Sequence, residues 1–107
     1  KYGILIKNIF LQGGCSEKCI NFHYSLQPAK GAVRVWEPEN QPKAVLQIVH
    51  GMAEHIERYD RFARYLNQNS ILVVGADNAS HGKSISKDGI RGYFGAEHGW
   101  NSLIQDI

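Results

Sequence analysis

Hydrophobic positions divide the second half of the chain into two apolar runs separated by an amphipathic segment. Residues 44–49 (AVLQIV) and 71–76 (ILVVGA) are almost continuously apolar, a pattern typical of strands covered on both faces in a parallel sheet. Between them, residues 58–67 place apolar side chains at helical intervals with polar ones opposite, which predicts a helix. The order strand, helix, strand predicts a βαβ unit with parallel strands.

Shorter patterns precede this unit. Residues 32–36 alternate between apolar and polar, which predicts a half-buried strand. The two prolines and the polar residues of segment 37–42 predict a surface loop. Two weaker strand candidates, residues 4–11 and 21–26, lie in the part of the chain that the pattern assigns least clearly.

The last residues of the sequence predict the beginning of a helix over residues 100–107. Asn101 or Ser102 is suited to cap its first turn. The side chains that would form its apolar face are spaced three or four residues apart: Trp100, Leu103, Ile104 and Ile107.

Composition limits the class of protein. A chain of 107 residues with 43% hydrophobic and 21% charged residues suits one small globular domain. The net charge of +2 comes from scattered Lys and Arg, so no nucleic-acid partner is expected. No apolar run reaches the roughly 18 residues of a membrane span, and residues 1–7 form no signal-peptide core. We therefore expect a cytoplasmic protein, with its oligomeric state left open.

Two cysteines and a histidine are spaced by four residues near the start of the chain. On a helix, Cys15, Cys19 and His23 would share one face and could bind zinc. The surrounding glycines disfavour a helix, and a fourth ligand is missing. Free reduced thiols are the better interpretation, so no metal and no cofactor is expected.

The first apolar run ends in His50-Gly51, followed by a charged segment. A buried strand fixes the position of such a turn, and glycine lets the backbone change direction sharply. The next N–H groups can then point at a substrate oxygen, as an acyl-transfer enzyme requires. We expect the Met52 N–H to be such an oxyanion donor, with the flexible Met52 side chain lining an acyl pocket.

Charged residues after this turn are expected to support it. Glu54 and Arg58 have the spacing of a favourable ion pair, which would pin the loop if it were partly buried. His50 and His55 could act as a base or a metal pair, but their spacing is not the His-x3-His of a helical zinc site. We interpret both histidines as structural groups hydrogen-bonded to loop backbone.

A second polar loop follows the second apolar run, at the strand end where open α/β sheets bind ligands. Asp77 and His81 could be read as an acid and a base. The alternative that we favour is structural: Asp77 accepts backbone N–H groups and His81 braces the turn, supported by Gly82 and Ser84. Ser84 lacks the Gly-x-Ser-x-Gly context of an activated serine.

Together these segments resemble the α/β-hydrolase superfamily, in its monoacylglycerol lipase and lysophospholipase-like branch of the serine aminopeptidase S33 type. The family pattern His-Gly-x-x-Glu-His-x-x-Arg-Tyr is matched at every fixed position by residues 50–59. The pattern Asp-x-x-Gly-His-Gly-x-Ser is matched by residues 77–84 except at Ser80, where the family usually has glycine. The resemblance covers residues 32–107, and residues 1–30 carry none.

The resemblance implies a serine hydrolase that cleaves carboxylic esters of lipids, of the monoacylglycerol or lysophospholipid type. It also implies the amino-terminal part of a mostly parallel sheet with flanking helices, incomplete, in which Met52 supplies an oxyanion N–H. The family's serine elbow, acid, base and cap would all follow Ile107. We therefore expect the isolated chain to be inactive, and its last strand to have an unpaired apolar edge.

Two other hypotheses remain open. The chain could be a non-catalytic α/β-hydrolase-like binding or interaction domain, which the absence of a serine elbow downstream would support. It could also belong to another hydrolase of the superfamily, such as a peptidase or a haloperoxidase-like enzyme. The pairs Glu54-His55 and Arg58-Tyr59 favour the lipase-like branch.

Overall fold

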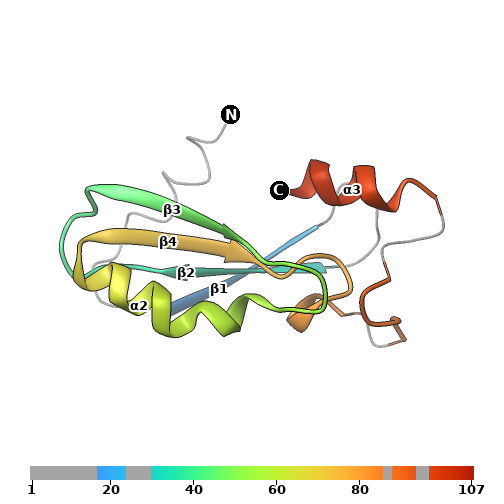
Figure 1. Cartoon of the computed structure of the whole chain (residues 1–107), viewed down its shortest axis with the longest axis horizontal. Helices are drawn as coiled ribbons and strands as arrows, with labels where there is room; N and C mark the ends of the chain where they lie inside the picture. The colour runs from blue at the N-terminus through green and yellow to red at the C-terminus, as the bar shows by residue number, and fades with distance from the viewer. Residues whose placement is uncertain (1–16, 24–29, 86–87, 94–96) are drawn as a thin grey trace.

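The structure is a computed structural model that describes residues 17–23, 30–85, 88–93 and 97–107. A four-stranded sheet with the strand order β1-β2-β4-β3 is its centre. In chain order the elements are β1 (Glu17–His23), β2 (Lys30–Trp36), β3 (Ala44–Val49), the 3₁₀ helix η1 (Ile56–Tyr59), α2 (Asp60–Gln68), β4 (Ile71–Ala76), the 3₁₀ helix η2 (Gly82–Ser84) and α3 (Gly99–Asp106) (Figure 1).

The sheet is mixed. β3 pairs with β4 in parallel, and α2 connects them, so the predicted βαβ unit is confirmed. β1 pairs with β2 and β2 with β4 in the antiparallel direction. The segment around Cys19 is therefore a strand and not the helix on which a zinc site would depend. Cys15 and the strand predicted over 4–11 lie outside the described residues.

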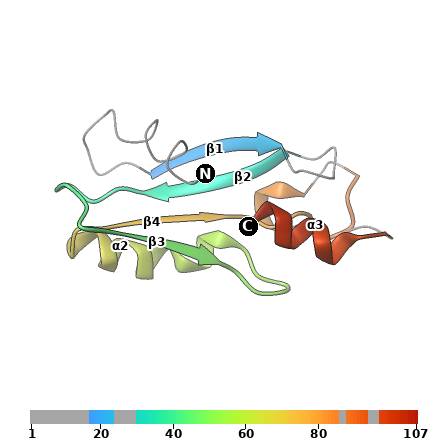
Figure 2. The ribbon, with the colours of Figure 1, turned by 90° about the horizontal axis from the view of Figure 1, so that it is seen from above.

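One face of the sheet is covered by α2, which packs mainly on β4 and also contacts β2 (Figures 1 and 2). The predicted amphipathic pattern explains this packing, because the buried Ala63 faces the sheet. The core on this side joins the three strands β2, β3 and β4 to η1 and α2 through the buried side chains of Trp36, Ile48, Ile56, Ala63 and Val73. On the opposite face Val35 and Leu72 form a second buried cluster.

β3 differs from its sequence prediction. Only Ile48 of this strand is buried, whereas Val45 and Val49 are 46% and 48% exposed. The expected cover on both faces is wrong because α2 packs mainly on β4 and β2, and β3 lies at an edge of the described sheet. The open edge was also expected on the last strand, but β4 lies between β2 and β3 and is paired on both sides.

The helix predicted at the end of the sequence is present as α3, but its details differ. His98 is the N-cap residue and makes no side-chain cap bond, whereas Ser102 lies inside the helix and is buried. The predicted apolar face is largely solvent-exposed, with Trp100 at 67%. The reason is position: α3 lies beyond the carboxyl ends of β3 and β4, away from α2 (Figures 1 and 2).

Candidate active site

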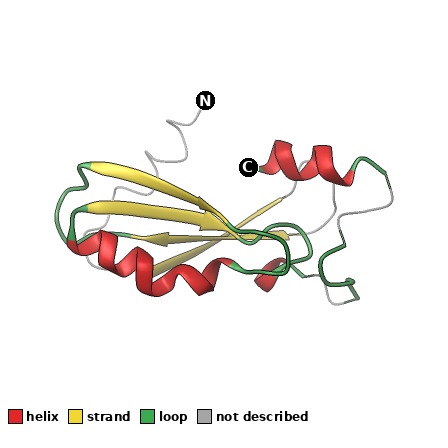
Figure 3. Cartoon of the chain, viewed as in Figure 1, coloured by secondary structure: helices red, strands yellow, loops and turns green. Residues whose placement is uncertain are grey.

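Two loops meet at one end of the sheet. Residues 50–55 follow β3 and residues 77–81 follow β4, and both strands run in the same direction (Figure 3). Because Val49 pairs with Ala76 at the ends of the strands, the two loops start side by side. The site residues predicted from separate parts of the sequence are thus brought together.

His50 and His81 hold these loops together by matched hydrogen bonds. The Asn78 N–H donates to Nε2 of His50 at 2.9 Å, and the Ala53 N–H donates to Nε2 of His81 at 3.3 Å. The rings are buried and tilted, with their centroids 5.3 Å apart. Each histidine therefore binds the backbone of the loop to which it does not belong.

Asp77 connects the two short helices that follow the loops. Its Oδ1 accepts the Ile56 N–H and its Oδ2 accepts the Lys83 N–H, both at 2.8 Å. Gly82 lies against this carboxylate with φ +48°, and a Cβ atom there would overlap it. Asp77 thus accepts backbone N–H groups, as the favoured interpretation had it, and Gly82 is the residue that leaves room for it.

Ser84 is a structural serine. Its hydroxyl donates to the Asp77 carbonyl oxygen at 2.9 Å and accepts the Ala32 N–H at 3.1 Å. The residue is 2% exposed. Since its oxygen is buried and bonded to backbone on two sides, Ser84 ties η2 to β2 and is not placed as a nucleophile.

Glu54 fixes the first turn of the loop after β3. Its carboxylate accepts the Gly51 N–H at 3.0 Å and the Tyr59 hydroxyl at 2.9 Å, and Arg58 lies 3.6 Å away. The Gly51 N–H, followed by the Tyr59 hydroxyl, lowers the pKa of Glu54, and the same carboxylate raises the pKa of Tyr59. The sequence indicated the exposed Arg58 as the partner of Glu54 but missed these two shorter bonds.

The Met52 N–H lies between two occupied backbone donors. Gly51 donates to Glu54 and Ala53 donates to His81. Within the part of the chain that the structure describes, no residue accepts a hydrogen bond from Met52. Ala53 has φ 60°, a left-handed conformation that turns the loop at this point. The Met52 side chain is 80% exposed.

His55 does not behave as predicted. Its side chain makes no hydrogen bond to any residue in the described ranges, whereas the sequence predicted a bond to loop backbone. It precedes η1 in an extended conformation and makes no cap bond to that helix.

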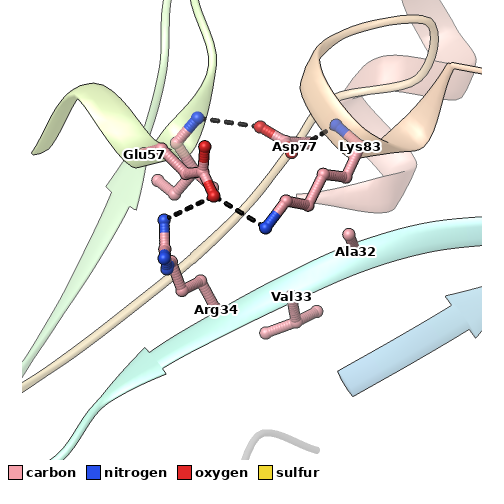
Figure 4. Close-up of a pocket in the computed structure, with 7 residues that line it drawn as sticks. Ala32, Val33, Arg34, Glu57, Asp77 and Lys83 are labelled. Carbon is pink, nitrogen blue, oxygen red and sulfur yellow. Dashed lines mark hydrogen bonds and ion pairs between the residues drawn. The ribbon is translucent and has the colours of Figure 1, made fainter. Parts of the chain in front are cut away.

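A small pocket beside the loops contains an ion cluster that the sequence analysis missed. Arg34 and Lys83 reach one carboxylate oxygen of Glu57, at 3.0 and 2.7 Å (Figure 4). Lys83 is the main cause, ahead of Arg34, of the lowered pKa of Glu57. The space in this pocket is about 10 Å³, room for one water molecule, so it is no substrate site. Only the fold brings these distant residues together.

Among the described residues, no cluster of three or more His, Cys, Asp or Glu side chains could hold a metal ion. Within the same residues, no helix has the length and apolar character needed to cross a membrane.

A family model confirms the resemblance seen in the motifs. The model described as serine aminopeptidase, S33 (Hydrolase_4) matches residues 40–107, which include both loops. The chain therefore belongs to this family of α/β-hydrolases.

Two individual proteins match parts of this chain in sequence. The chain is 41% identical over 51 residues to the monoglyceride lipase of Rattus norvegicus, covering 48% of this chain but 17% of that lipase. It is 36% identical over 64 residues to protein K6 of Vaccinia virus (strain Western Reserve), covering 60% of this chain and 79% of K6. The chain thus spans about a sixth of the length of the rat enzyme.

The fold has a counterpart among solved structures. A soluble variant of monoglyceride lipase from Saccharomyces cerevisiae superposes with a TM-score of 0.67 at 17% identity, covering 86% of this chain and 30% of that one. At this level of identity the likeness establishes the fold, and the predicted α/β class is confirmed.

Proposed function

We propose that this chain supplies the oxyanion loop of a serine hydrolase that cleaves carboxylic esters of lipids, of the monoacylglycerol or lysophospholipid type. The observation that carries the proposal is the Met52 N–H. Its two neighbours are bound to Glu54 and His81, whereas the Met52 N–H has no acceptor among the described residues and can donate to a ligand. Such a donor stabilises the negative oxygen that forms when an ester carbonyl is attacked.

The named relatives support the substrate class. The rat relative is a monoglyceride lipase, and its matched segment is 41% identical. The motifs around Gly51, Glu54 and Asp77 account for the geometry of the two loops. In this role Glu54, His50 and His81 are positioning residues, because each binds backbone and would not touch the substrate.

The chain by itself is proposed to be inactive. Both buried histidines have their ring nitrogens engaged with backbone, and Ser84 is bonded on two sides. These residues therefore offer neither a free base nor an activated nucleophile. Incubation of the purified chain with a short-chain p-nitrophenyl ester tests this point. No turnover is expected, and turnover by the wild-type chain would contradict the proposal. Turnover that persists in the Ser84→Ala and His81→Gln variants would show in addition that the nucleophile lies elsewhere.

A chimera tests the oxyanion role directly. Residues 40–107 of this chain would replace the matching segment of the rat monoglyceride lipase. Met52→Pro in that chimera removes the N–H and should lower kcat by roughly 10²- to 10³-fold. Met52→Ala keeps the N–H and serves as the control. Equal activity of the two variants would rule out the role proposed for this group.

A second function class follows from the same contacts. If the chain acts without a serine elbow, the loops would form a non-catalytic binding or interaction domain. The engaged state of His50 and His81 favours this alternative for the isolated chain. A chimera without activity, combined with correct folding, would support it.

A further inference from the structure

The reciprocal bonds of His50 and His81 each use a ring nitrogen as the acceptor, which is possible only for a neutral ring. We propose that these two side chains lock the loop of residues 50–55 to the loop of residues 77–81 only while both rings are neutral, so that acidification releases the loop that carries Met52. The consequence for catalysis rests on the oxyanion role proposed above. The lock itself does not depend on that role.

The neutral state follows from the hydrogen-bond partners. Nδ1 of His50 lies 2.9 Å from the Gly51 carbonyl oxygen, and Nδ1 of His81 lies 2.9 Å from the Ala79 carbonyl oxygen. A carbonyl oxygen can only accept, so each Nδ1 carries the proton. The Asn78 side-chain amide also lies 3.5 Å from Nδ1 of His50, but it donates to the His50 carbonyl oxygen at the shorter distance of 3.2 Å. Each Nε2 is then the acceptor that the N–H of Asn78 or Ala53 requires.

Protonation is incompatible with this arrangement. A proton added to Nε2 turns the acceptor into a donor that faces another donor, and the bond to Asn78 or Ala53 is lost. Two charged rings would also lie with centroids 5.3 Å apart in a buried place. Histidine is the side chain that ordinarily changes charge between about pH 5 and pH 8. The locked form is therefore favoured while both rings are neutral and is weakened once a ring is protonated.

The charged groups around the rings favour release further. Oδ1 of Asp77 lies 4.0 Å from Nε2 of His50, so a protonated His50 has an anion to turn towards. That movement exchanges the bond from Asn78 for an ion pair. The other charged groups on neighbouring elements are engaged: Glu54 with Gly51 and Tyr59, and Glu57 of η1 with Lys83 of η2.

Hydrogen exchange of the full 107-residue chain tests the lock without any substrate. The protection factors of the Ala53 and Asn78 amides should fall about tenfold between about pH 7.5 and pH 5.5. The amide of Val73 in the paired strand β4 is the internal reference and should keep its protection. His50→Gln and His81→Gln retain a side-chain acceptor that does not titrate, so each should flatten the pH response.

His98 offers a matched control. It is exposed, lies on the N-cap of α3 and has φ 55°, which asparagine also adopts. His98→Asn should leave the pH response of Ala53 and Asn78 unchanged. Unchanged protection of both amides in the wild-type chain, or a full pH response in both Gln variants, would overturn the lock.

NMR titration of the wild-type chain covers the case in which a Gln variant does not fold. The Ala53 and Asn78 amide signals should shift with the same midpoint as the ring protons of His50 and His81. Amide signals that do not follow the ring titration would overturn the proposal. A chimera that is insensitive to Met52→Pro, with the lock intact, would contradict the oxyanion role alone.

Discussion

The side chain of Ile56 packs directly on Gly75 of β4, and a methyl group on this glycine would overlap the Ile56 side chain. A Cβ atom on Gly75 would also lie 2.9 Å from the Ile48 carbonyl oxygen of the neighbouring strand. Ile56 is the first residue of η1 and donates its N–H to Asp77. The close approach of Gly75 and Ile56 therefore holds η1, and with it the loop of residues 50–55, against the sheet.

Gly75→Ala should lower the free energy of unfolding by about 1–3 kcal/mol, because the added methyl group must displace Ile56. Urea unfolding followed by tryptophan fluorescence measures the change. Ile56→Val removes the nearest methyl group, so the double variant should lose less stability than the sum of the two single variants. Strictly additive losses would mean that Gly75 and Ile56 do not interact as described.

Asp60→Ala should destabilise the chain through Trp36. The indole N–H of the buried Trp36 donates to Asp60 at 2.9 Å, and the variant leaves this donor without its acceptor. We expect a loss of about 1–2 kcal/mol in thermal or urea unfolding. Arg64→Ala removes the partner of the exposed ion pair at 2.8 Å and should cost less than 1 kcal/mol. Equal losses of stability in Asp60→Ala and Arg64→Ala would show that the effect comes from the ion pair and not from the Trp36 hydrogen bond.

Glu54→Gln should change how stability depends on pH. The Gly51 N–H, followed by the Tyr59 hydroxyl, lowers the pKa of Glu54 below 4.5 in the folded chain. A lowered folded-state pKa means that the stabilisation is present above the unfolded-state pKa and is lost as the pH falls through the folded-state pKa. Below pH 4.5 the free energy of unfolding should therefore fall more steeply with falling pH in the wild type than in Glu54→Gln. Parallel curves would argue against the bonds to Gly51 and Tyr59.

Ser80→Gly should stabilise the chain. Ser80 has φ 60°, a left-handed conformation that costs a non-glycine residue about 1 kcal/mol. The turn expected from the family motif is therefore formed despite the serine, and glycine should recover about that amount in melting experiments. Ala79→Gly is the control, because Ala79 is buried and is not among the positive-φ residues. It should destabilise.

Val45→Lys should reduce self-association of the isolated chain. Val45 lies on the edge strand β3 and is 46% exposed, and an unpaired apolar edge favours pairing with other chains. Sedimentation analysis should show several-fold less oligomer than for the wild type. Phe62→Lys removes a similarly exposed apolar group from α2 and should have little effect. A comparable reduction by both variants would indicate general hydrophobicity and not the strand edge.

The sequence predicted the elements that local patterns control. The βαβ unit was recoverable because residues 44–49 and 71–76 are apolar runs and residues 58–67 have helical periodicity. The roles of Asp77 and His50 were also recoverable, since polar residues after strand ends commonly bind backbone. The general role of each residue needs only the local sequence, whereas its particular partners, 21 and 28 residues away, come from the fold.

Long-range features were not recoverable. An apolar run has the same sequence pattern in a central strand and in an edge strand, so the exposure of Val45 could not be predicted. The Arg34–Glu57–Lys83 cluster joins three separate elements and has no local spacing. The bonds that link His50 and His81 to the opposite loop also depend on the register of β3 and β4.

The exposure of the Met52 side chain bears on how distant members of this family are recognised. A backbone N–H donor places little demand on the side chain of its residue, and the Met52 side chain is exposed to solvent. Evolutionary drift at position 52 would therefore leave the loop geometry intact, while changes at Gly51, Ala53 or Glu54 would alter it. Comparisons that weigh those three neighbours should detect divergent homologues that a match to methionine would overlook.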